Sequence, residues 1–337
     1  MSITMNGSLA FRFLRGGLLL AILFSTMGCN RSPSARMESV AISPDGSLLA
    51  IDFGDDSASF IYKLDVESGN ATRLTDAKAG SESSPAFSPD GKRISYSYSA
   101  GKGQPFNIVI ENVDGSNLHS WSPSGGSDYW PVFSLDGKTI IFARAAYYGN
   151  YSPIAQPHAH GWDVYAGDSD GTNVRQLTHE EFYMASPLSV SDDGKSMVLV
   201  TEGGHSSQQI AIYSFDQTEK PAISLRPHIP DEPKLGPEFD FPNFMPDGRS
   251  ILFMAASSGH HGYDYDVYRM NIASGLVERL TQGNGFATGL KVSANGKTAV
   301  FLKWRLNWRQ MPVQSTPYLL DVQTHKLTLL KVKGLPS

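Results

Sequence analysis

A short phrase that recurs six times constrains the fold of this chain more than any other feature. In the copy at residues 86–98, an alternating apolar run leads into Ser88-Pro-Asp-Gly91 and a second alternating run leads out. Alternation of this kind predicts a half-buried strand on each side. Pro presets φ for a type I turn, Asp hydrogen-bonds nearby backbone, and Gly supplies the left-handed residue that closes a β-hairpin.

The copies are regularly spaced along the chain. The other five occupy residues 41–53, 132–144, 189–201, 243–255 and 291–303. Successive turn centres lie 45, 46, 57, 54 and 48 residues apart, which leaves room for two further strands in each unit. A period of about fifty residues with four strands per unit is typical of a β-propeller. We therefore predict an all-β fold, a six-bladed propeller with four-stranded antiparallel blades.

The N-terminal residues have the pattern of an export signal. Arg12 and Arg15 flank an apolar run over residues 16–24, which is too short to span a bilayer unaided. Thr26-Met-Gly-Cys29 follows and resembles a bacterial lipobox, in which the cysteine is acylated at the cleavage point. Cys29 is also the only cysteine in the sequence, so no disulfide can form within the fold.

These features predict three segments. Residues 1–28 are expected to be a lipoprotein signal peptide, residues 29–37 a tether beginning at the lipidated Cys29, and residues 38–337 the propeller. Two or more acyl chains hold a protein stably at a membrane. We expect an exported bacterial lipoprotein on the periplasmic side of the outer membrane or on the cell surface.

Charge and composition exclude one class of partner. The formal net charge is −5, and no basic run of the kind needed by a nucleic-acid-binding protein is present. Removal of residues 1–28 would take away two arginines and no acidic residue, leaving the mature chain more acidic. We therefore expect no nucleic-acid partner.

The strands after each hairpin carry a second recurring pattern. A third strand of the type Asp163-Val-Tyr165 is followed by a fourth with Arg-Leu-Thr, as at Arg279-Leu-Thr281. Together with Ser-Pro-Asp-Gly-Lys, this pattern resembles the WD40-like repeat of TolB-type propellers, which prolyl-oligopeptidase-like and tricorn-like proteins also carry. The resemblance covers nearly all of the chain after the tether and implies the propeller fold. TolB carries an α/β domain before its propeller, whereas only residues 30–37 separate Cys29 from the first blade here. A Tol–Pal partnership is therefore not expected.

The two faces of the predicted ring differ in sequence. In a four-stranded meander the Ser-Pro-Asp-Gly turns lie on one face, together with the connections from third to fourth strands. The opposite face receives the second-to-third connections, which we expect to be long loops over residues 145–161, 257–264 and 304–309. Long, aromatic and ionisable loops on one side of a rigid scaffold predict the functional face.

Our main functional hypothesis is a non-enzymatic binding module for an envelope protein, a peptide or a glycan. Aromatic and arginine side chains give large contact areas at low entropic cost. The candidate anchors are Trp130, Tyr148, Trp162, Tyr263, Trp304, Arg305, Trp308 and Arg309. For Trp130 and Trp162, packing between blades is an open alternative.

The alternative function is a metal-dependent polysaccharide lyase or hydrolase. The candidate ligands of a divalent metal are His158, His160, His260 and His261. Oligogalacturonate lyases, which also carry TolB-like repeats, hold a divalent metal through such histidines, although the spacing here matches no motif that transfers residue by residue. The histidines are otherwise ordinary loop residues, and no other cofactor is expected.

One segment matches the sequence of a hydrolase motif but lacks the structural context that the motif needs. Residues 167–171 read Gly-Asp-Ser-Asp-Gly, which fits the G-x-S-x-G pattern. They align with residues 112–115 as a turn between third and fourth strands. A nucleophile elbow needs a strand, a turn and a helix, so we predict a plain turn and assign no catalytic residue here.

Overall fold

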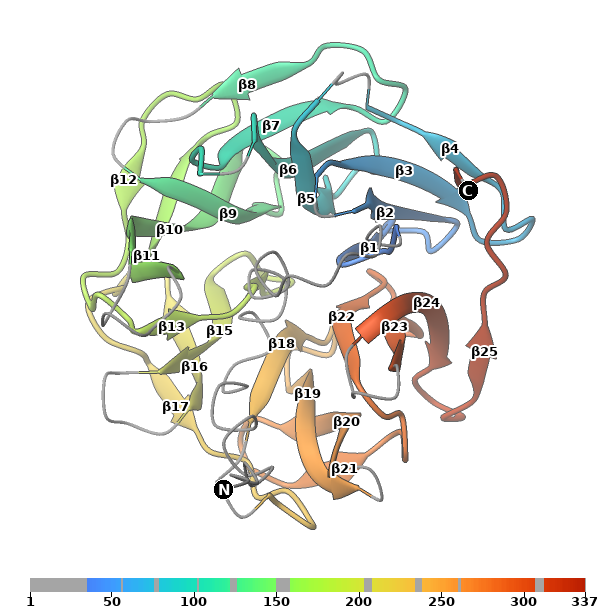
Figure 1. The fold of residues 1–337 in the computed structure, drawn as a ribbon. Helices are drawn as coiled ribbons and strands as arrows, with labels where there is room; N and C mark the ends of the chain where they lie inside the picture. The colour runs from blue at the N-terminus through green and yellow to red at the C-terminus, as the bar shows by residue number, and fades with distance from the viewer. Residues whose placement is uncertain are drawn as a thin grey trace, which may run out of the picture.

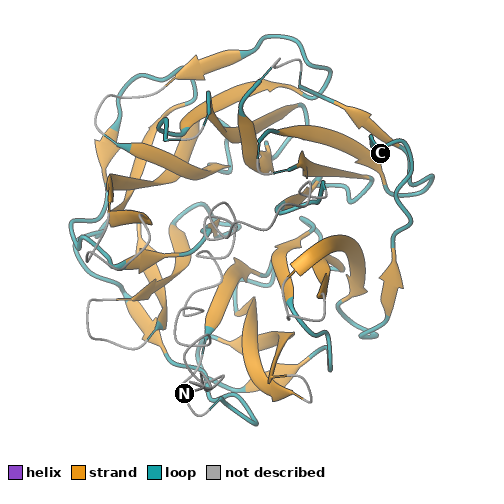
Figure 2. Ribbon diagram, in the orientation of Figure 1, coloured by secondary structure: helices purple, strands orange, loops and turns teal. Residues whose placement is uncertain are grey.

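Strands form all of the regular secondary structure in the part of the chain that this computed structural model describes (Figure 2). Those residues are 35–55, 57–75, 79–101, 103–121, 126–149, 158–202, 208–233, 238–259, 262–306 and 312–336. Within these ranges no helix is long and apolar enough to cross a membrane. The expected signal peptide and the expected lipidation site at Cys29 lie outside the described residues.

The strands are short and follow one another through meanders. The first eight are β1 (Val40–Ile42), β2 (Leu48–Gly54), β3 (Ser59–Asp65), β4 (Ala71–Arg73), β5 (Ser81–Phe87), β6 (Arg93–Ser99), β7 (Asn107–Asn112) and β8 (His119–Trp121). The next nine are β9 (Ser127–Phe133), β10 (Thr139–Gly149), β11 (His158–Asp168), β12 (Arg175–Gln176), β13 (Met184–Ala185), β14 (Ser189–Val190), β15 (Ser196–Glu202), β16 (Gln209–Ser214) and β17 (Ile223–Leu225). The last eight are β18 (Phe239–Phe244), β19 (Ser250–Gly259), β20 (Gly262–Asn271), β21 (Val277–Arg279), β22 (Ala287–Val292), β23 (Thr298–Leu306), β24 (Pro312–Asp321) and β25 (Leu327–Leu329).

The described strands pair into five sheets, which contain six antiparallel groups. The largest sheet has eight strands, but its halves β1–β4 and β5–β8 are joined by a single parallel bridge between Ser59 and Ser81. We number the groups blade one (β1–β4), blade two (β5–β8), blade three (β9–β12), blade four (β13–β17), blade five (β18–β21) and blade six (β22–β25). Blade four has an extra strand because β13 and β14 both pair with β15.

The blades follow one another around a ring, with the first strand of each blade toward the centre and the last at the rim (Figure 1). Each of six buried apolar clusters joins side chains of two neighbouring blades. One cluster combines Met37 and Leu49 of the N-terminal part with Val300 and Leu330 of blade six. The last blade therefore packs on the first, as the linear order of the repeats predicts, and the fold is a propeller.

Hydrogen bonds reinforce this closure at two places. The backbone N–H of Met37 donates to Ser315 Oγ at 2.9 Å, and the Ser315 hydroxyl donates to the Met37 carbonyl at 2.6 Å. The chain after β25 runs beside β4, where Ala71 N–H donates to the Lys333 carbonyl and Lys333 N–H donates to the Gly69 carbonyl, both at 2.8 Å. Both chain ends thus stabilise the seam between blades six and one.

The six predicted turns are present with the expected chemistry. Left-handed φ values of 61–79° occur at the glycines of all six turns, Gly46, Gly91, Gly137, Gly194, Gly248 and Gly296. In blade two, Asp90 Oδ1 accepts hydrogen bonds from the Ser88 hydroxyl at 2.5 Å and from Lys92 N–H at 3.1 Å. The Ser88 hydroxyl and the Lys92 N–H hold the pKa of Asp90 below its ordinary value. Local side-chain hydrogen bonds therefore fix the turn geometry that the sequence predicts.

The turn at residues 167–171 is also as predicted. Gly171 N–H donates to the Asp168 carbonyl at 2.8 Å, which closes a tight turn between β11 and β12. The G-x-S-x-G letters therefore belong to a β-turn and not to a nucleophile elbow.

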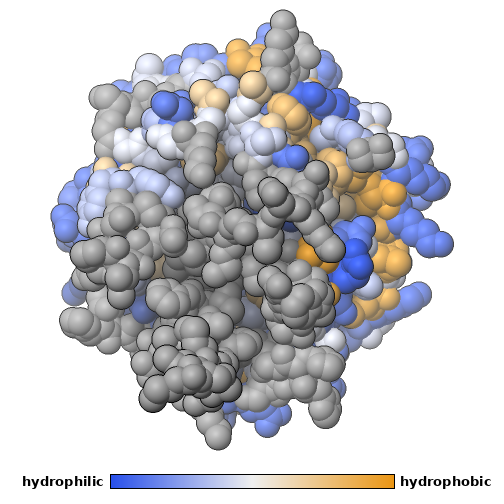
Figure 3. Space-filling model, in the orientation of Figure 1, coloured by the Kyte–Doolittle hydropathy of each residue, from blue (hydrophilic) through white to orange (hydrophobic). Residues whose placement is uncertain are grey.

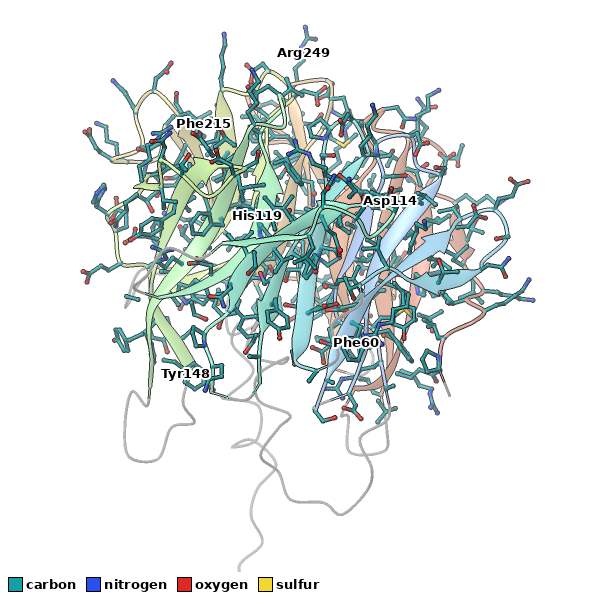
Figure 4. All side chains as sticks on the ribbon, turned by 90° about the horizontal axis from the view of Figure 1, so that it is seen from above. Phe60, Asp114, His119, Tyr148, Phe215 and Arg249 are labelled. Carbon is teal, nitrogen blue, oxygen red and sulfur yellow. The ribbon has the colours of Figure 1, made fainter. Side chains whose placement is uncertain are left out.

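The ring has two different faces. The face that carries the six Ser-Pro-Asp-Gly-type turns, from Gly46 to Gly296, is called the turn face, and the opposite one the loop face. In the side view, Arg249 and Phe215 lie toward one edge, whereas Phe60 and Tyr148 lie at the other (Figure 4). Figures 1 and 3 look onto the loop face, and Figure 3 shows hydrophobic atoms on the side where the first and last blades meet.

The expectation of long loops on the loop face is wrong for the first and last residues of these segments, which are strands and not loops. Residues 145–149 and 158–161 continue β10 and β11, and residues 257–259 and 262–264 continue β19 and β20. Residues 304–306 likewise extend β23. The antiparallel pairing continues in register to Gly149–His158 and to Gly259–Gly262, so these hairpins project as strands.

Candidate binding site on the loop face

Two exposed tyrosines stand at the projecting tip of blade three. The ladder between β10 and β11 runs from the Thr139–Asp168 pair to the Gly149–His158 pair. Near its end Tyr147 lies opposite His160, and Tyr148 lies opposite Ala159. Tyr147 is 60 % exposed and Tyr148 is 54 % exposed, and Figure 4 shows Tyr148 at the loop-face edge. A rigid ladder therefore presents two aromatic rings to solvent.

A buried aromatic stack supports this tip. The rings of Trp130 and Trp162 stack with centroids 5.0 Å apart, and Tyr129 packs against both at 5.7 and 5.2 Å. Phe106 of the preceding blade contacts Tyr129 at 4.9 Å. Burial raises the pKa of Tyr129 to about 12. Trp130 is only 7 % exposed and Trp162 only 3 %, so both indoles pack in the core and offer no surface for the anchoring role expected of them.

The backbone at Trp130 is part of a repeated bend. Its φ is 54°, and Ser84, Phe241 and Gly289 have left-handed φ of 57°, 50° and 77° at the equivalent register shifts of β5, β18 and β22. A non-glycine residue in this region costs about 1 kcal/mol. Because the bend recurs around the ring, it belongs to the inner strands and not to a site unique to blade three.

His160 stacks on the ring of Tyr147. It is buried, with its ring 5.2 Å from that of Tyr147 and 6.4 Å from that of Tyr183. Tyr183 belongs to the link between blades three and four and is 36 % exposed. Tyr148 follows Tyr147 on β10 and points to the other side of the ladder. We call the three exposed rings at this tip, Tyr147, Tyr148 and Tyr183, the tyrosine patch. Sequence reasoning selected only Tyr148 of these three, because the contact of Tyr183 with blade three is made across the seam.

A buried carboxylate shapes the link that carries Tyr183. Asp163 accepts hydrogen bonds from the Thr178 hydroxyl at 2.7 Å, from Glu180 N–H at 2.9 Å and from Glu181 N–H at 3.3 Å. Phe182 is tied to Trp162 by two backbone hydrogen bonds of 2.9 and 3.0 Å. Asp163 therefore has the structural role that its place in the repeat suggests, and the link is held firmly on blade three.

Blade six supplies a second aromatic region. Trp304 is half-buried in β23, donates its indole N–H to Thr288 Oγ1 at 2.9 Å and lies 6.2 Å from the Phe286 ring. Arg305 beside it is exposed. The candidate anchors Trp308 and Arg309 lie outside the described residues, as does the side chain of Tyr263. Of the candidate anchors on blades five and six, the described side chains are those of Trp304 and Arg305.

The metal hypothesis falls largely outside the described part of the chain. His260 and His261 and the side chain of His158 are not described, and His160 is packed between tyrosines. Within the described ranges, no group of three or more His, Cys, Asp and Glu side chains could hold a metal ion. The four-histidine site therefore stays a prediction.

Two buried carboxyl groups, Asp52 near the loop-face end of β2 and Asp240 near that of β18, were not anticipated from the sequence. Burial, and secondarily the charge of Glu38, raises the pKa of Asp52 to about 7. Burial also raises the pKa of Asp240 to about 7, with the charge of Glu238 adding to it. The main cause in both cases is burial, which depends on packing against other strands, so no local sequence motif indicates these groups.

Comparisons with known proteins agree with this fold. The profile of the TolB beta propeller domain matches residues 28–156. The Tol-Pal system protein TolB of Francisella tularensis subsp. mediasiatica is 45% identical over 53 residues. That segment is 16% of this chain and 12% of the relative, so the chain matches a small part of the relative's length.

Solved structures resemble the chain over a much larger share. TolB from Acinetobacter baumannii superposes with a TM-score of 0.61 at 18% identity, covering 93% of this chain and 66% of that one. An oligogalacturonate lyase in complex with manganese gives a TM-score of 0.55 at 14% identity, covering 88% and 78%. At such identities the likeness establishes a shared propeller fold.

Proposed function

We propose that this protein is a lipid-anchored binding module of the bacterial envelope, without enzymatic activity, and that the tyrosine patch contacts a partner protein. The observation that carries the proposal is the exposure of Tyr147, Tyr148 and Tyr183 on a rigid, stacked support. Exposed tyrosines give large contact area with few rotatable bonds, which favours their use as interface anchors. The likeness to the Tol-Pal system protein TolB supports a protein as the partner.

A capture experiment from detergent-solubilised membranes tests this function. The bait is the acylated protein, compared with a Tyr147→Ser, Tyr148→Ser variant. The matched control is Leu135→Ser, which removes a side chain of similar exposure, 50 %, from the turn face. We expect a specific partner to be lost with the double variant and kept with the control. Equal partner lists for wild type and the double variant would remove the tyrosine patch from the proposal.

The membrane anchor is a separate part of the proposal. Cys29 follows the apolar export segment and is the sole cysteine, which supports acylation at this position. Cys29→Ala should shift the protein from the membrane fraction to the soluble fraction, because it removes the thiol that would carry the acyl chains of the anchor. A variant that stays with membranes would show that another feature retains it.

The alternative, a metal-dependent lyase or hydrolase, is favoured by one observation, the fold likeness to the manganese-bound lyase. His158, His160, His260 and His261 would be its ligands. Metal analysis of the purified protein tests this alternative. Stoichiometric divalent metal that is lost in a His260→Ala, His261→Ala variant would favour the enzyme over the binding module.

A further inference from the structure

The tyrosine patch has an acidic border. Glu180 and Glu181 are exposed on the link that carries Tyr183, and we call them the acidic edge. Neither has an ion-pair partner among the described residues. The segments that build the patch, residues 145–149, 158–163, 178–186 and 200–202, contain no lysine and no arginine. The carboxylates therefore face solvent without a neighbouring fixed cation.

The arginine on the strand next to this link is already paired, since Arg144 of β10 lies opposite Asp163 of β11. Arg144 of β10 is buried and donates to both carboxylate oxygens of Asp128, at 2.7 and 2.9 Å. A buried bidentate pair of this kind is held by geometry and by the cost of separating its charges. Arg144 is thus not free to move out and neutralise the acidic edge.

The backbone holds the acidic edge in a conformation that a glutamate disfavours. Glu181 has φ of 48°, in the left-handed region, and its N–H is bound by Asp163. The corresponding link of blade five, after Thr281, has glycines at its left-handed positions, Gly283 and Gly285. Blade three therefore keeps a charged side chain where glycine would be the less strained choice.

We propose that the tyrosine patch and the acidic edge together bind a cationic segment, rich in arginine or lysine, of the partner protein. This inference rests on the proposed function and names the chemistry of its partner. A guanidinium or ammonium group stacks favourably on a tyrosine face and forms charge-assisted hydrogen bonds with a carboxylate. An acidic polysaccharide or an anionic lipid headgroup would be repelled by the same two glutamates. A neutral sugar could use the rings but would leave the carboxylates without a role.

A peptide-binding measurement tests the charge preference directly. The probe is a fluorescent arginine–glycine repeat peptide, compared with glutamine–glycine and glutamate–glycine repeats at low ionic strength. We expect only the arginine peptide to bind, and we expect added salt to weaken it. Glu180→Gln, Glu181→Gln should weaken binding by about fivefold, and Tyr147→Ser, Tyr148→Ser by at least as much.

A matched variant separates a local site from the overall negative charge. Asp216→Asn, Glu219→Gln removes two exposed carboxylates from the connection between β16 and β17 on the turn face. This variant should bind the arginine peptide as wild type does. An equal loss of binding in both charge variants, or no loss in the Glu180, Glu181 variant, would overturn the cationic-segment proposal.

Glu181→Gly excludes misfolding as the cause of any loss. Glycine relieves the left-handed φ, so the unfolding temperature should stay the same or rise while peptide binding falls. A lower unfolding temperature would show that the side chain serves the fold, and would count against a binding role.

Failure of this inference can be told from failure of the proposed function by repeating the membrane capture with the same variants. Loss of the partner in the tyrosine variant, with retention in the Glu180, Glu181 variant and at high salt, would keep the function and reject a cationic partner. Retention of the partner in both variants would reject the tyrosine patch as the contact surface.

Discussion

The turn face of this ring repeats nearly the same structure in every blade, whereas the loop face differs from blade to blade. On the turn face, successive blades place nearly identical turns against one another. A Cβ built on Gly296 would come within 2.9 Å of Pro246 Cδ, and one on Gly194 within 3.6 Å of Leu135 Cβ. On the loop face, the exposed tyrosines among the described side chains are Tyr147, Tyr148 and Tyr183, all at the tip of blade three and its link to blade four. Repetition of local turn chemistry thus fixes one face and leaves the other free to carry a specific surface.

The acidic groups of the two faces differ in the same sense. The Ser134 hydroxyl and Lys138 N–H lower the pKa of Asp136 in its exposed turn, so this carboxylate stabilises the fold in its charged form. Near the loop-face ends of β2 and β18, burial raises the pKa of Asp52 and of Asp240 to about 7. Changes on the turn face should therefore act mainly on stability, and changes on the exposed loop face mainly on binding.

The largest expected effect is on the turn face, at Gly296. Its φ is +68° and an added Cβ would meet Pro246, so Gly296→Ala should lower the free energy of unfolding by about 3 kcal/mol. The matched control is Gly283→Ala on the loop face, which has the same φ but no atom within 4 Å of the added Cβ, and should cost only about 1 kcal/mol. Urea unfolding measures both. Equal losses would show that contact between neighbouring turns does not matter.

Asp163→Asn should give the next largest effect. Replacing the buried carboxylate weakens the hydrogen bonds that hold residues 178–181, and we expect a loss of about 2 kcal/mol in urea unfolding. Asp266 is the equivalent residue of blade five, where it binds Arg279 and Thr281. Asp266→Asn should lower stability comparably but leave partner capture intact, whereas Asp163→Asn should weaken capture as well. Intact partner capture by the Asp163 variant would show that the link at residues 178–181 is not part of the binding site.

The raised pKa values predict an unusual dependence of stability on pH. The ordinary pKa of an aspartate is 3.8, and Asp240 has a pKa of about 7 in the folded protein. Between these values the unfolded chain is ionised while the folded one keeps its proton, so stability falls as pH rises toward 7 and then levels off. We expect a fall of at least about 1 kcal/mol between pH 5 and pH 8. Asp240→Asn should flatten the profile, and a wild-type profile that rises over this range would be inconsistent with buried, protonated carboxyls.

The smallest expected effect on stability is at the tyrosine patch itself. Tyr147→Ser, Tyr148→Ser removes exposed side chains, so the free energy of unfolding should change by less than about 0.5 kcal/mol for each. Circular dichroism during thermal unfolding provides the measurement. A cooperative destabilisation similar to that of the Gly296 variant would mean that the rings are part of the core support.

The elements that the sequence predicts well are those determined by neighbours in the chain. The turn at Asp90-Gly91 needs only Ser88, a glycine and two alternating strands, and it has the predicted hydrogen bonds. The burial of Trp130 depends instead on Trp162, on a different strand, and on a bulge with left-handed φ that no local pattern reveals. The same holds for Tyr183, whose contact with His160 crosses from the inter-blade link to β11. Long-range contacts of this kind assemble the candidate site, which is why the sequence indicated the face and Tyr148 but not Tyr147 or Tyr183.

Photo-crosslinking in cells tests most directly whether the loop face, and not the turn face, meets the partner. A photoreactive amino acid is placed at Tyr148 in one variant and at Leu135 in another, two positions of similar exposure on opposite faces. We predict a discrete, higher-mass adduct from position 148 and none from position 135. An adduct from position 135 alone would contradict the assignment of the loop face as the binding surface.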